Sequence, residues 1–330
     1  MKYYRKKTNL SHEEFARNLM ILQNYNFIKQ LADSINVEII PIKGVDLLNT
    51  IYAQNLNRNV KDIDILCKSY EDCIKLVNEL LKYDYRLEFP FALKEDVIRN
   101  KNKVSLLSCS TVKANVDIHT ELITKKFFAL SVGKFNLHAI DRCKNGALNK
   151  IDNWLFLQQH AVFHNFSDMK WMKDLEILYN NFDKQEKETL YERINTYNFR
   201  RISLVTFDFM NDVLGKEIFN LNLFSINKSK RNLLKFSKWW RETKNNKKKF
   251  ISKVINPFWE FVFIDSLHHR FKAWLKLIFP SKGMIVNVYR IRNTWMIPFF
   301  YPINLLISSF ATIFFYLIYH YICLFSSNNK

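Results

Sequence analysis

Val60-Lys61-Asp62-Ile63-Asp64-Ile65-Leu66-Cys67 is the stretch from which the fold can be predicted. Its β-branched and apolar residues are typical of a β-strand. Because alternate side chains of a strand share a face, Asp62 and Asp64 point the same way, about 7 Å apart along the chain. Two carboxylates on one face repel each other, and a divalent cation that takes oxygen ligands relieves this repulsion. An exposed Asp-x-Asp pair is also common as a solvated face, so the stretch alone leaves both interpretations open.

The composition limits the classes of protein to be considered. With 330 residues, 48% of them hydrophobic, the chain can fill one large domain or two ordinary ones. Its net charge of +19 indicates an anionic partner, either nucleic acid or an acidic membrane surface. Five scattered cysteines without a C-x-x-C pair favour a reducing compartment. Five glycines are too few for the Gly-rich phosphate loops, and no apolar run follows the basic start, so no signal peptide is expected.

The residues around the Asp-x-Asp stretch predict alternating helices and strands. A capping box, Ser11-x-x-Glu14, opens the first expected helix. The expected elements are a helix at 11–36, a strand at 37–43, a helix at 45–53, a strand at 60–67, a helix at 70–83, and strands at 103–109 and 112–120. This order predicts an α/β (α+β) fold, in which a small mixed sheet carries flanking helices. Residues 120–150 fit no single prediction.

The pattern becomes helical from about residue 149. Apolar residues at helical spacing predict helices at 154–180, with a break near 165–168, and at 185–198 and 201–214. We therefore expect three parts: an α/β domain at 1–145, a helical domain at 146–225, and a basic region with an apolar tail at 226–330.

The segment 227–253 is strongly basic, with eleven Lys and Arg residues against the single acid Glu242. Trp239 and Trp240 lie inside it. One interpretation is a solvated, partly flexible face. The other is a surface that binds anionic lipid or nucleic acid.

The C-terminal tail contains an apolar run at 303–322 that is long enough to cross a bilayer as a helix. Upstream, residues 267–279 mix basic and aromatic positions like an interfacial helix. Lys282, Arg290 and Arg292 precede the run, so by charge bias the domain side would be cytoplasmic. A transmembrane tail, a monotopic insertion and a buried core helix all remain open, and membrane contact in some form is favoured.

A third carboxylate lies on a second alternating strand, Val116-Asp117-Ile118-His119. Val116 and Ile118 would face the core, so Asp117 and His119 would face the other way. If this strand neighbours the Asp62/Asp64 strand, three carboxylates converge. Such a ligand set suits the two-metal mechanism, in which Mg²⁺ ions hold a nucleoside triphosphate and activate an attacking hydroxyl.

Two basic residues precede the carboxylates. Lys43-Gly44 lies where a strand meets a helix N-terminus, and backbone donors there can bind an anion. Arg58 is close enough in sequence to hold a phosphate group. The plainer alternatives are a solvated strand-end lysine for Lys43 and a structural partner of an aspartate for Arg58.

Together these motifs resemble a family. Ile42-Lys43-Gly44, Arg58, Asp62-x-Asp64 and Val116-Asp117-x-His119, followed by His160 and Trp171-x-x-Asp174, are similar to an uncharacterised group of bacterial nucleotidyltransferase-like proteins. That group belongs to the DNA polymerase beta superfamily, and the resemblance covers about residues 10–180. Most superfamily members carry Gly-Ser at the phosphate-binding turn, whereas this chain has Lys43-Gly44 followed by Val45. The serine contact is therefore absent, and the lysine is expected to replace it.

The resemblance implies a Mg²⁺-dependent transfer of a nucleoside monophosphate from an NTP to a hydroxyl, with release of pyrophosphate. Asp62 and Asp64 would hold two Mg²⁺ ions, for which Mn²⁺ could substitute, and Asp117 would complete the metal site and help to deprotonate the acceptor. Lys43, the Gly44 amide and Arg58 would bind the triphosphate. The helical domain at 146–225 would then close the nucleotide cleft.

The remaining polar residues of the pattern have less specific expected roles. The resemblance suggests that His160 or Lys170 contacts the nucleotide. His119 is expected to donate a hydrogen bond to a metal-binding carboxylate or to contact the substrate. His160 and His164 lie four apart on an expected helix, but the glutamate of the HExxH zinc motif is absent. Asp174 is expected to hold Lys170, Lys173 or a helix end.

The acceptor is open: a protein, a sugar or lipid-linked precursor of the cell surface, or tRNA. The basic, membrane-proximal tail favours a protein or a surface precursor, at the cytoplasmic face of an anionic membrane. The alternatives are a non-catalytic, membrane-associated protein that keeps the fold and binds nucleotide or polyanion, and a nucleic-acid-modifying, toxin-like transferase.

Overall fold

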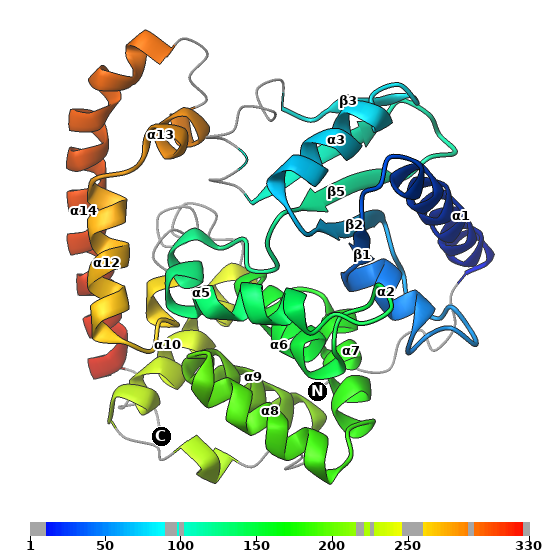
Figure 1. The fold of residues 1–330 in the computed structure, drawn as a ribbon. Coiled ribbons are helices and arrows are strands. Elements are labelled where there is room, and N and C mark those ends of the chain that lie inside the picture. Colours follow the sequence, from blue (N-terminus) through cyan, green and yellow to red (C-terminus); the bar gives the residue numbers. More distant parts are fainter. Residues whose placement is uncertain are drawn as a thin grey trace. The chain divides into compact units, whose positions relative to one another are not determined.

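The computed structural model describes residues 11–89, 98, 102–215, 221–224, 228–245, 260–289 and 294–325 (Figure 1). The chain divides into two compact units, each built from several stretches. The first unit comprises Met1–Thr124, Lys134–Phe156 and Lys173–Phe182. The second comprises Lys125–Gly133, Leu157–Met172 and Asp183–Lys330. The three-part division at 1–145, 146–225 and 226–330 stays a prediction.

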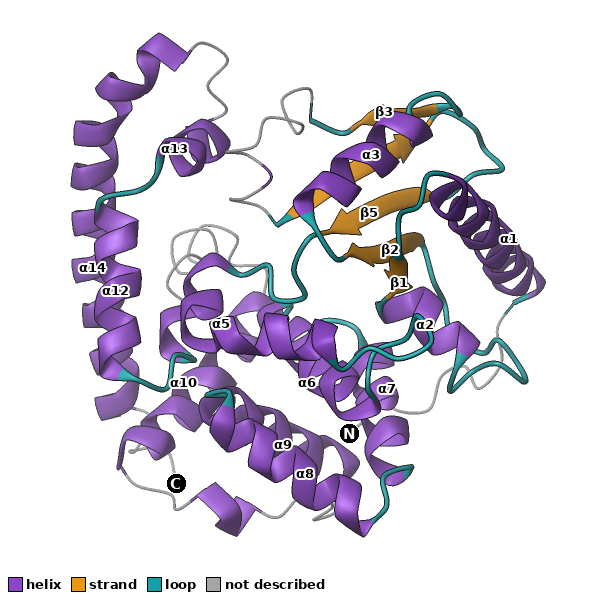
Figure 2. Cartoon of the chain, in the orientation of Figure 1, coloured by secondary structure: helices purple, strands orange, loops and turns teal. Residues whose placement is uncertain are grey.

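A five-stranded mixed sheet forms the centre of the first unit (Figure 2). In spatial order its strands are β1 (Ile39–Pro41), β2 (Asp62–Cys67), β5 (Asn115–His119), β4 (Lys103–Ser108) and β3 (Tyr85–Leu87). The β2–β5 pair is parallel, and the other three pairs are antiparallel. The predicted mixed α/β fold is confirmed, and the two strands with paired acidic motifs are direct neighbours.

Three helices of the first unit pack around β2. They are α1 (His12–Ser34), α2 (Lys43–Asn49) and α3 (Tyr70–Leu80). The predicted capping box is present, because the Glu14 amide donates to Ser11 Oγ and the Ser11 amide donates to Glu14 Oε2. The apolar alternation of β2 is also realised, since Ile63 and Ile65 have no exposed surface. This buried side fixes which face of the strand remains for its aspartates.

The stretch 120–150, which fitted no prediction, is mostly helical. It forms α5 (Lys126–Asp141), which has a non-helical residue at Val132 with φ −111° and ψ 18°. The helices α6 (Lys150–Phe163) and α7 (Met169–Asn180) follow. The predicted break near 165–168 is confirmed between them, where Asn165 and Phe166 have positive φ angles of 57° and 48°.

The second unit is helical. Its remaining elements are α8 (Lys184–Thr196), α9 (Arg200–Leu214), η1 (Leu221–Phe224), α10 (Lys228–Asn245), α12 (Leu267–Ile278), α13 (Lys282–Tyr289), η2 (Thr294–Met296) and α14 (Ile297–Phe325). The first part of the predicted basic segment forms α10, and residues 246–253 lie outside the described residues. Within the described ranges, Ile297–Leu317 is the one stretch of helix long and apolar enough to cross a membrane, by length and composition alone.

Candidate metal and nucleotide site

The register of β2 and β5 aligns the acidic motifs. Asp64 pairs with Asp117 across the parallel strands, and Asp62 pairs with Asn115. His119, two residues beyond Asp117, lies on the same face of β5. On the other side of β5, the register of β4 places Lys103 opposite His119. The pleat therefore directs two carboxylates, an imidazole and a lysine toward one region of the sheet.

Cations already contact both central carboxylates. Lys43 Nζ lies 2.5 Å from Asp64 Oδ1, and Lys103 Nζ lies 2.8 Å from Asp117 Oδ2. His119 Nε2 lies 3.0 Å from the same Asp64 oxygen. One ligand atom each from Asp64, Asp117 and His119 falls within 4.8 Å of the others. This compact group is the best-placed metal-binding set in the described part of the chain.

Burial and charge set the protonation states in this cluster. Burial alone would raise the pKa of Asp64, but the Lys43 ammonium and the His119 hydrogen bond hold that pKa well below its usual range. Burial lowers the pKa of His119, and the positive charge of Lys43 lowers it further. The neutral ring therefore donates its Nε2 proton to Asp64. Its Nδ1 atom is buried without a hydrogen-bond partner in the described residues.

Lys103 stays charged beside Asp117. Burial would lower the pKa of this lysine, but the Asp117 carboxylate raises it above its ordinary value. Lys103 is not among the site residues predicted from the sequence, although Lys103 is the first residue of the strand expected at 103–109. The available signal was the alternation of Lys103 with Ser105 on that strand, but only the register with β5 reveals which residues they face.

The donor set fits a divalent cation that prefers oxygen ligands. Asp64 and Asp117 supply two carboxylates, which suit both Mg²⁺ and Mn²⁺. Asp62 lies at the exposed start of β2, outside the group of three. Its predicted share in the metal site stays a prediction.

Lys43 and Gly44 open helix α2, as predicted. Lys43 has a positive φ of 53°, which is unfavourable for a residue with a Cβ atom. A Cβ atom at Gly44 would lie 2.6 Å from Val60 Cγ1 and 3.0 Å from Arg58 Nη1. Glycine is therefore required here for close packing against the 58–60 loop. The predicted phosphate contacts of Lys43 and Gly44 are untested by this geometry.

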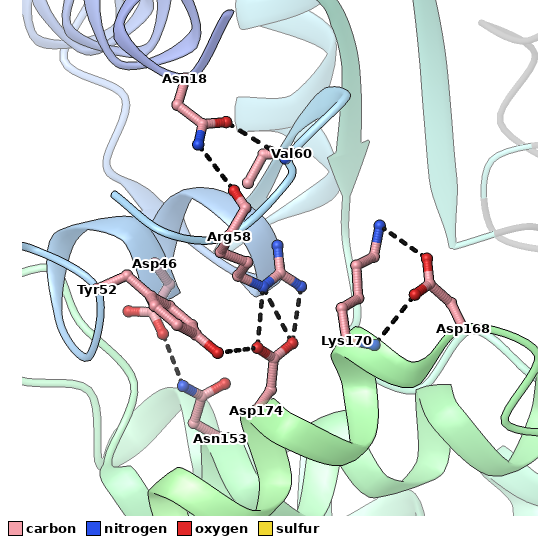
Figure 3. A network of polar contacts seen from close by, with 9 residues as sticks. All are labelled: Asn18, Asp46, Tyr52, Arg58, Val60, Asn153, Asp168, Lys170 and Asp174. Carbon is pink, nitrogen blue, oxygen red and sulfur yellow. Dashed lines mark hydrogen bonds and ion pairs between the residues drawn. The ribbon is translucent and has the colours of Figure 1, made fainter. Parts of the chain in front are cut away.

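Arg58 forms a buried ion pair with Asp174 of α7 (Figure 3). Arg58 Nε donates to both Asp174 oxygens at 3.1 and 3.0 Å, and Arg58 Nη2 lies 2.9 Å from Oδ2. The hydroxyl of Tyr52 donates to Asp174 Oδ1 at 2.9 Å. Arg58 thus takes the alternative role, as partner of an aspartate, and Asp174 holds Arg58 rather than the predicted Lys170, Lys173 or helix end. A phosphate contact by Arg58 stays a prediction.

Asn18 of α1 holds the loop that carries Arg58. Its Nδ2 donates to the carbonyls of Leu56 and Arg58 at 2.8 Å each, and its Oδ1 accepts from the Val60 amide at 3.3 Å (Figure 3). These buried hydrogen bonds fix the backbone just before β2 begins. The strand that carries Asp62 and Asp64 is therefore positioned by three features. They are the loop held by Asn18, the Arg58–Asp174 ion pair and the close packing at Gly44.

Asp46 of α2 is a third buried carboxylate of the first unit. Its Oδ2 accepts a hydrogen bond of 2.6 Å from Asn153 Nδ2 (Figure 3). Burial raises the pKa of Asp46 to about 7, although the Asn153 hydrogen bond and the charge of Arg58 lower it. No metal-binding group in the described residues includes it.

His160 and Lys170, the predicted nucleotide contacts, belong to the second unit. The His160 ring lies 4.5 Å from the His164 ring and 5.1 Å from the Trp171 ring, between centroids. Lys170 Nζ forms an ion pair of 3.3 Å with Asp168. The histidine pair is part of an aromatic cluster, and the contacts of His160 and Lys170 with nucleotide stay predictions.

Comparison with known protein families agrees with the arrangement in the sheet. The profile of an uncharacterised nucleotidyltransferase family matches residues 4–215. The chain belongs to this family. The match covers the whole sheet, the Asp64 cluster and the Arg58–Asp174 pair, and it ends at the close of α9. No curated protein and no solved structure matches the chain.

Proposed function

We propose that this nucleotidyltransferase-family protein moves a nucleoside monophosphate from an NTP to a hydroxyl acceptor and releases pyrophosphate. The observation that carries the proposal is the in-register pair Asp64 and Asp117, with His119 beside them, in a chain of this family. A new P–O bond forms to the acceptor oxygen as the bond between the α- and β-phosphates breaks. The general base accepts the proton of the acceptor hydroxyl, and the electron pair of the broken bond leaves with pyrophosphate.

The proposed metal ligands are Asp64 and Asp117, with Asp62 as a further carboxylate at the exposed end of β2. Mg²⁺ is the proposed ion, and Mn²⁺ is its expected substitute. Bound divalent cations would supply charge neutralisation on the phosphates and on the attacking oxygen. His119 would orient Asp64 through its Nε2–H, because metal-site carboxylates generally need such outer partners.

The chain's own residues would bind substrate and move the proton. Asp117 would accept the proton of the acceptor hydroxyl. The Lys43 ammonium would leave Asp64 and form an ion pair with the triphosphate. The Gly44 amide would donate a further hydrogen bond to the triphosphate. Lys103 would add positive charge beside Asp117. Arg58 would act mainly by positioning α2 and β2, and His160 or Lys170 would contact the nucleotide.

An incubation with α-³²P-labelled NTPs, Mg²⁺ or Mn²⁺ and host lysate tests this function. Label on an acceptor that disappears in Asp64→Asn and in Asp117→Asn is the expected result. Asp84→Asn is the matched control, because Asp84 pairs with Lys113 at the protein surface. Absence of label with every NTP, together with equal nucleotide binding by wild type and both variants, would contradict the proposal.

One observation favours the alternative of a non-catalytic protein that binds nucleotide or polyanion. Lys43 and Lys103 already balance the charges of Asp64 and Asp117, so the cluster is electrostatically satisfied without a metal. In that case Mg²⁺ would not change nucleotide affinity. Equilibrium binding of an NTP analogue with Mg²⁺ and with EDTA distinguishes the two functions.

We further propose that the chain works at the cytoplasmic face of an anionic membrane, attached by its C-terminal region. The apolar helix α14 and the basic residues before it support this location. A protein or a cell-surface precursor is then the favoured acceptor, with tRNA as the alternative. Treatment of the labelled product with nuclease, protease or organic solvent identifies the acceptor class.

A further inference from the structure

Helix α14 exposes one apolar face along most of its length. Seven of its exposed apolar residues recur at intervals of three and four, so they share one side of the helix. These seven expose between 42% and 73% of their surface and form what we call the apolar stripe: Phe299, Ile303, Leu306, Phe310, Ile313, Phe314 and Leu317. Leu305, Ile307 and Tyr316 are also exposed and flank the stripe. A continuous stripe of this size, unlike single exposed apolar residues, indicates a partner.

The opposite face of α14 packs against the protein through polar as well as apolar and aromatic side chains. Asn304 and Ser308 are buried there. Asn304 Nδ2 donates to the Leu277 carbonyl at 3.0 Å, Ser308 Oγ approaches the same oxygen at 3.4 Å, and Tyr289 pairs with Asn304 Oδ1 at 3.3 Å. The hydrogen-bonding groups of α14 are thus used on the protein side, whereas the exposed side carries the apolar stripe. The exposed side of α14 is therefore suited to an apolar medium.

The protein contacts of α14 extend from one end of the stripe to the other. The Phe300 ring lies 4.8 Å from Tyr289 of α13, and the Phe315 and Tyr319 rings lie 5.8 and 5.3 Å from Phe236 of α10. From Phe300 to Tyr319 the helix rises roughly 28 Å at about 1.5 Å per residue. That distance is nearly the whole hydrocarbon thickness of about 30 Å.

The partners of α14 are too charged to enter hydrocarbon with it. Lys235 and Lys238 flank Phe236 on α10, and Tyr319 is an electrostatic neighbour of Arg201 and Arg270. A spanning α14 would carry these groups into the bilayer or lose its packing, and charged side chains are strongly disfavoured there. The contacts thus separate two binding modes that sequence analysis leaves open.

We propose that α14 lies in the plane of an anionic bilayer, with its apolar stripe inserted into one leaflet and its opposite face kept on the protein. This inference rests on the membrane attachment proposed above and replaces a spanning tail by a monotopic one. The sequence from Ser266 to Phe325 contains six Lys and Arg residues and no Asp or Glu, which complements anionic headgroups.

Helix α12, which packs on α14, adds to this membrane-binding region (Figure 1). Leu267, Phe271 and Trp274 are exposed at helical spacing, and the Phe271 and Trp274 rings stack at 6.0 Å. The exposed Lys272 lies between them in sequence. Apolar and aromatic residues mixed with lysines are typical of helices that lie in the membrane interface.

Flotation with vesicles tests the surface. The full-length wild type should float with vesicles of equal phosphatidylglycerol and phosphatidylcholine, and much less with phosphatidylcholine alone. Leu306→Glu combined with Phe310→Glu should lower the partition coefficient at least tenfold. Val112→Glu, at a residue 67% exposed in the first unit, should not change it. Equal flotation of all three proteins, or no flotation of the wild type, would overturn the proposal.

Site-specific labelling separates in-plane from spanning insertion. Single cysteines at Phe299→Cys and Leu317→Cys are labelled with the fluorophore NBD, after Cys109, Cys143 and Cys323 are replaced by serine. Cys67 and Cys73 are buried and stay. Dithionite added outside sealed vesicles should quench both probes to the same extent. Protection of one probe until detergent is added would mean that α14 spans the bilayer, which would overturn the in-plane arrangement but not the attachment.

Two further measurements distinguish membrane binding from catalysis and from self-association. Nucleotidyl transfer is assayed in detergent without vesicles, so that loss of transfer and loss of membrane binding are scored independently. Sedimentation without vesicles tests a second copy of the chain as the partner. A dimer of the wild type that the Leu306→Glu and Phe310→Glu changes dissociate, without vesicle binding, would assign the stripe to self-association instead.

Discussion

Asp64 and Asp174 are both buried aspartates of the first unit, but their surroundings differ. Three donor groups contact the Asp174 carboxylate: Nε and Nη2 of Arg58 and the hydroxyl of Tyr52. Together they reach both of its oxygens. The hydrogen bonds of Asp64 converge on Oδ1, from Lys43 and His119. No described residue reaches its Oδ2, and Asp117 lies beside it. A saturated carboxylate is a structural element, whereas one with a free oxygen and a neighbouring carboxylate retains ligand capacity.

Asp46 adds a third case to this comparison. An amide, Asn153, is its hydrogen-bond donor, and Arg58 acts on it only through its charge. Burial therefore dominates and raises the pKa of Asp46, whereas the direct lysine contact lowers that of Asp64. For Asp46 and Asp64, the nearest donor therefore determines the direction in which the pKa shifts.

The largest effect is expected from Asp64→Asn. If the open carboxylates hold metal, transfer of label should fall about a thousandfold, because several kcal/mol of charge stabilisation are lost and each ~1.4 kcal/mol is tenfold in rate. Single-turnover assays normalised to folded protein measure this. A comparable loss in Asp174→Asn with unchanged stability would break the distinction between the two aspartates.

Removal of the saturated aspartate should mainly destabilise the protein. Asp174→Ala leaves Arg58 charged and buried without its partner, which typically costs about 3–5 kcal/mol of unfolding free energy. Urea denaturation measures this loss. Glu38→Ala is the control, since the carboxylate of Glu38 is 53% exposed and its ion pair with Lys68 should contribute below ~1 kcal/mol. Equal destabilisation by both changes would contradict a structural role specific to Asp174.

The sequence predicts the open site better than the saturated one. Alternation of aspartate with β-branched residues identifies β2 and β5, and the same alternation on both strands anticipates that their carboxylates share a face. Arg58 and Asp174 are 116 residues apart, on a loop and a helix with no common pattern, so local sequence cannot pair them. Local sequence likewise cannot show whether α14 spans a membrane or lies in its plane, because that depends on contacts with α10, α12 and α13.

A smaller effect is expected where the 58–60 loop packs on α2. Gly44→Ala places a methyl group 2.6 Å from Val60 Cγ1, and such overpacking costs about 1–3 kcal/mol. Val60→Ala should recover part of this loss in the double variant, because the two sites are in contact. At Gly133 no atom lies within 4 Å of the new methyl group. Gly133→Ala should therefore be neutral or slightly stabilising, and thermal unfolding of the four proteins compares them.

The last effect concerns Asp46 and the pH dependence of stability, and it is small within any one pH unit. Its pKa rises from about 3.9 in the unfolded chain to about 7 in the folded protein. Between these values the folded state binds more protons than the unfolded state, so the unfolding free energy decreases as pH rises. The slope from this group is at most about 1.4 kcal/mol per pH unit.

Asp46→Asn keeps an oxygen acceptor for Asn153 and removes the titration, so it sharpens the contrast with the charged Asp64. Unfolding free energies of wild type and variant between pH 4 and 8 should converge at the low end, diverge up to about pH 7 and then stay parallel, with the variant more stable at the upper end. Tyr25, Arg58 and Asn153 surround the carboxylate and are unchanged in the variant. Parallel curves over this whole range would mean that Asp46 is charged throughout. The positive charge of Arg58 would then outweigh the effect of burial on the pKa of Asp46.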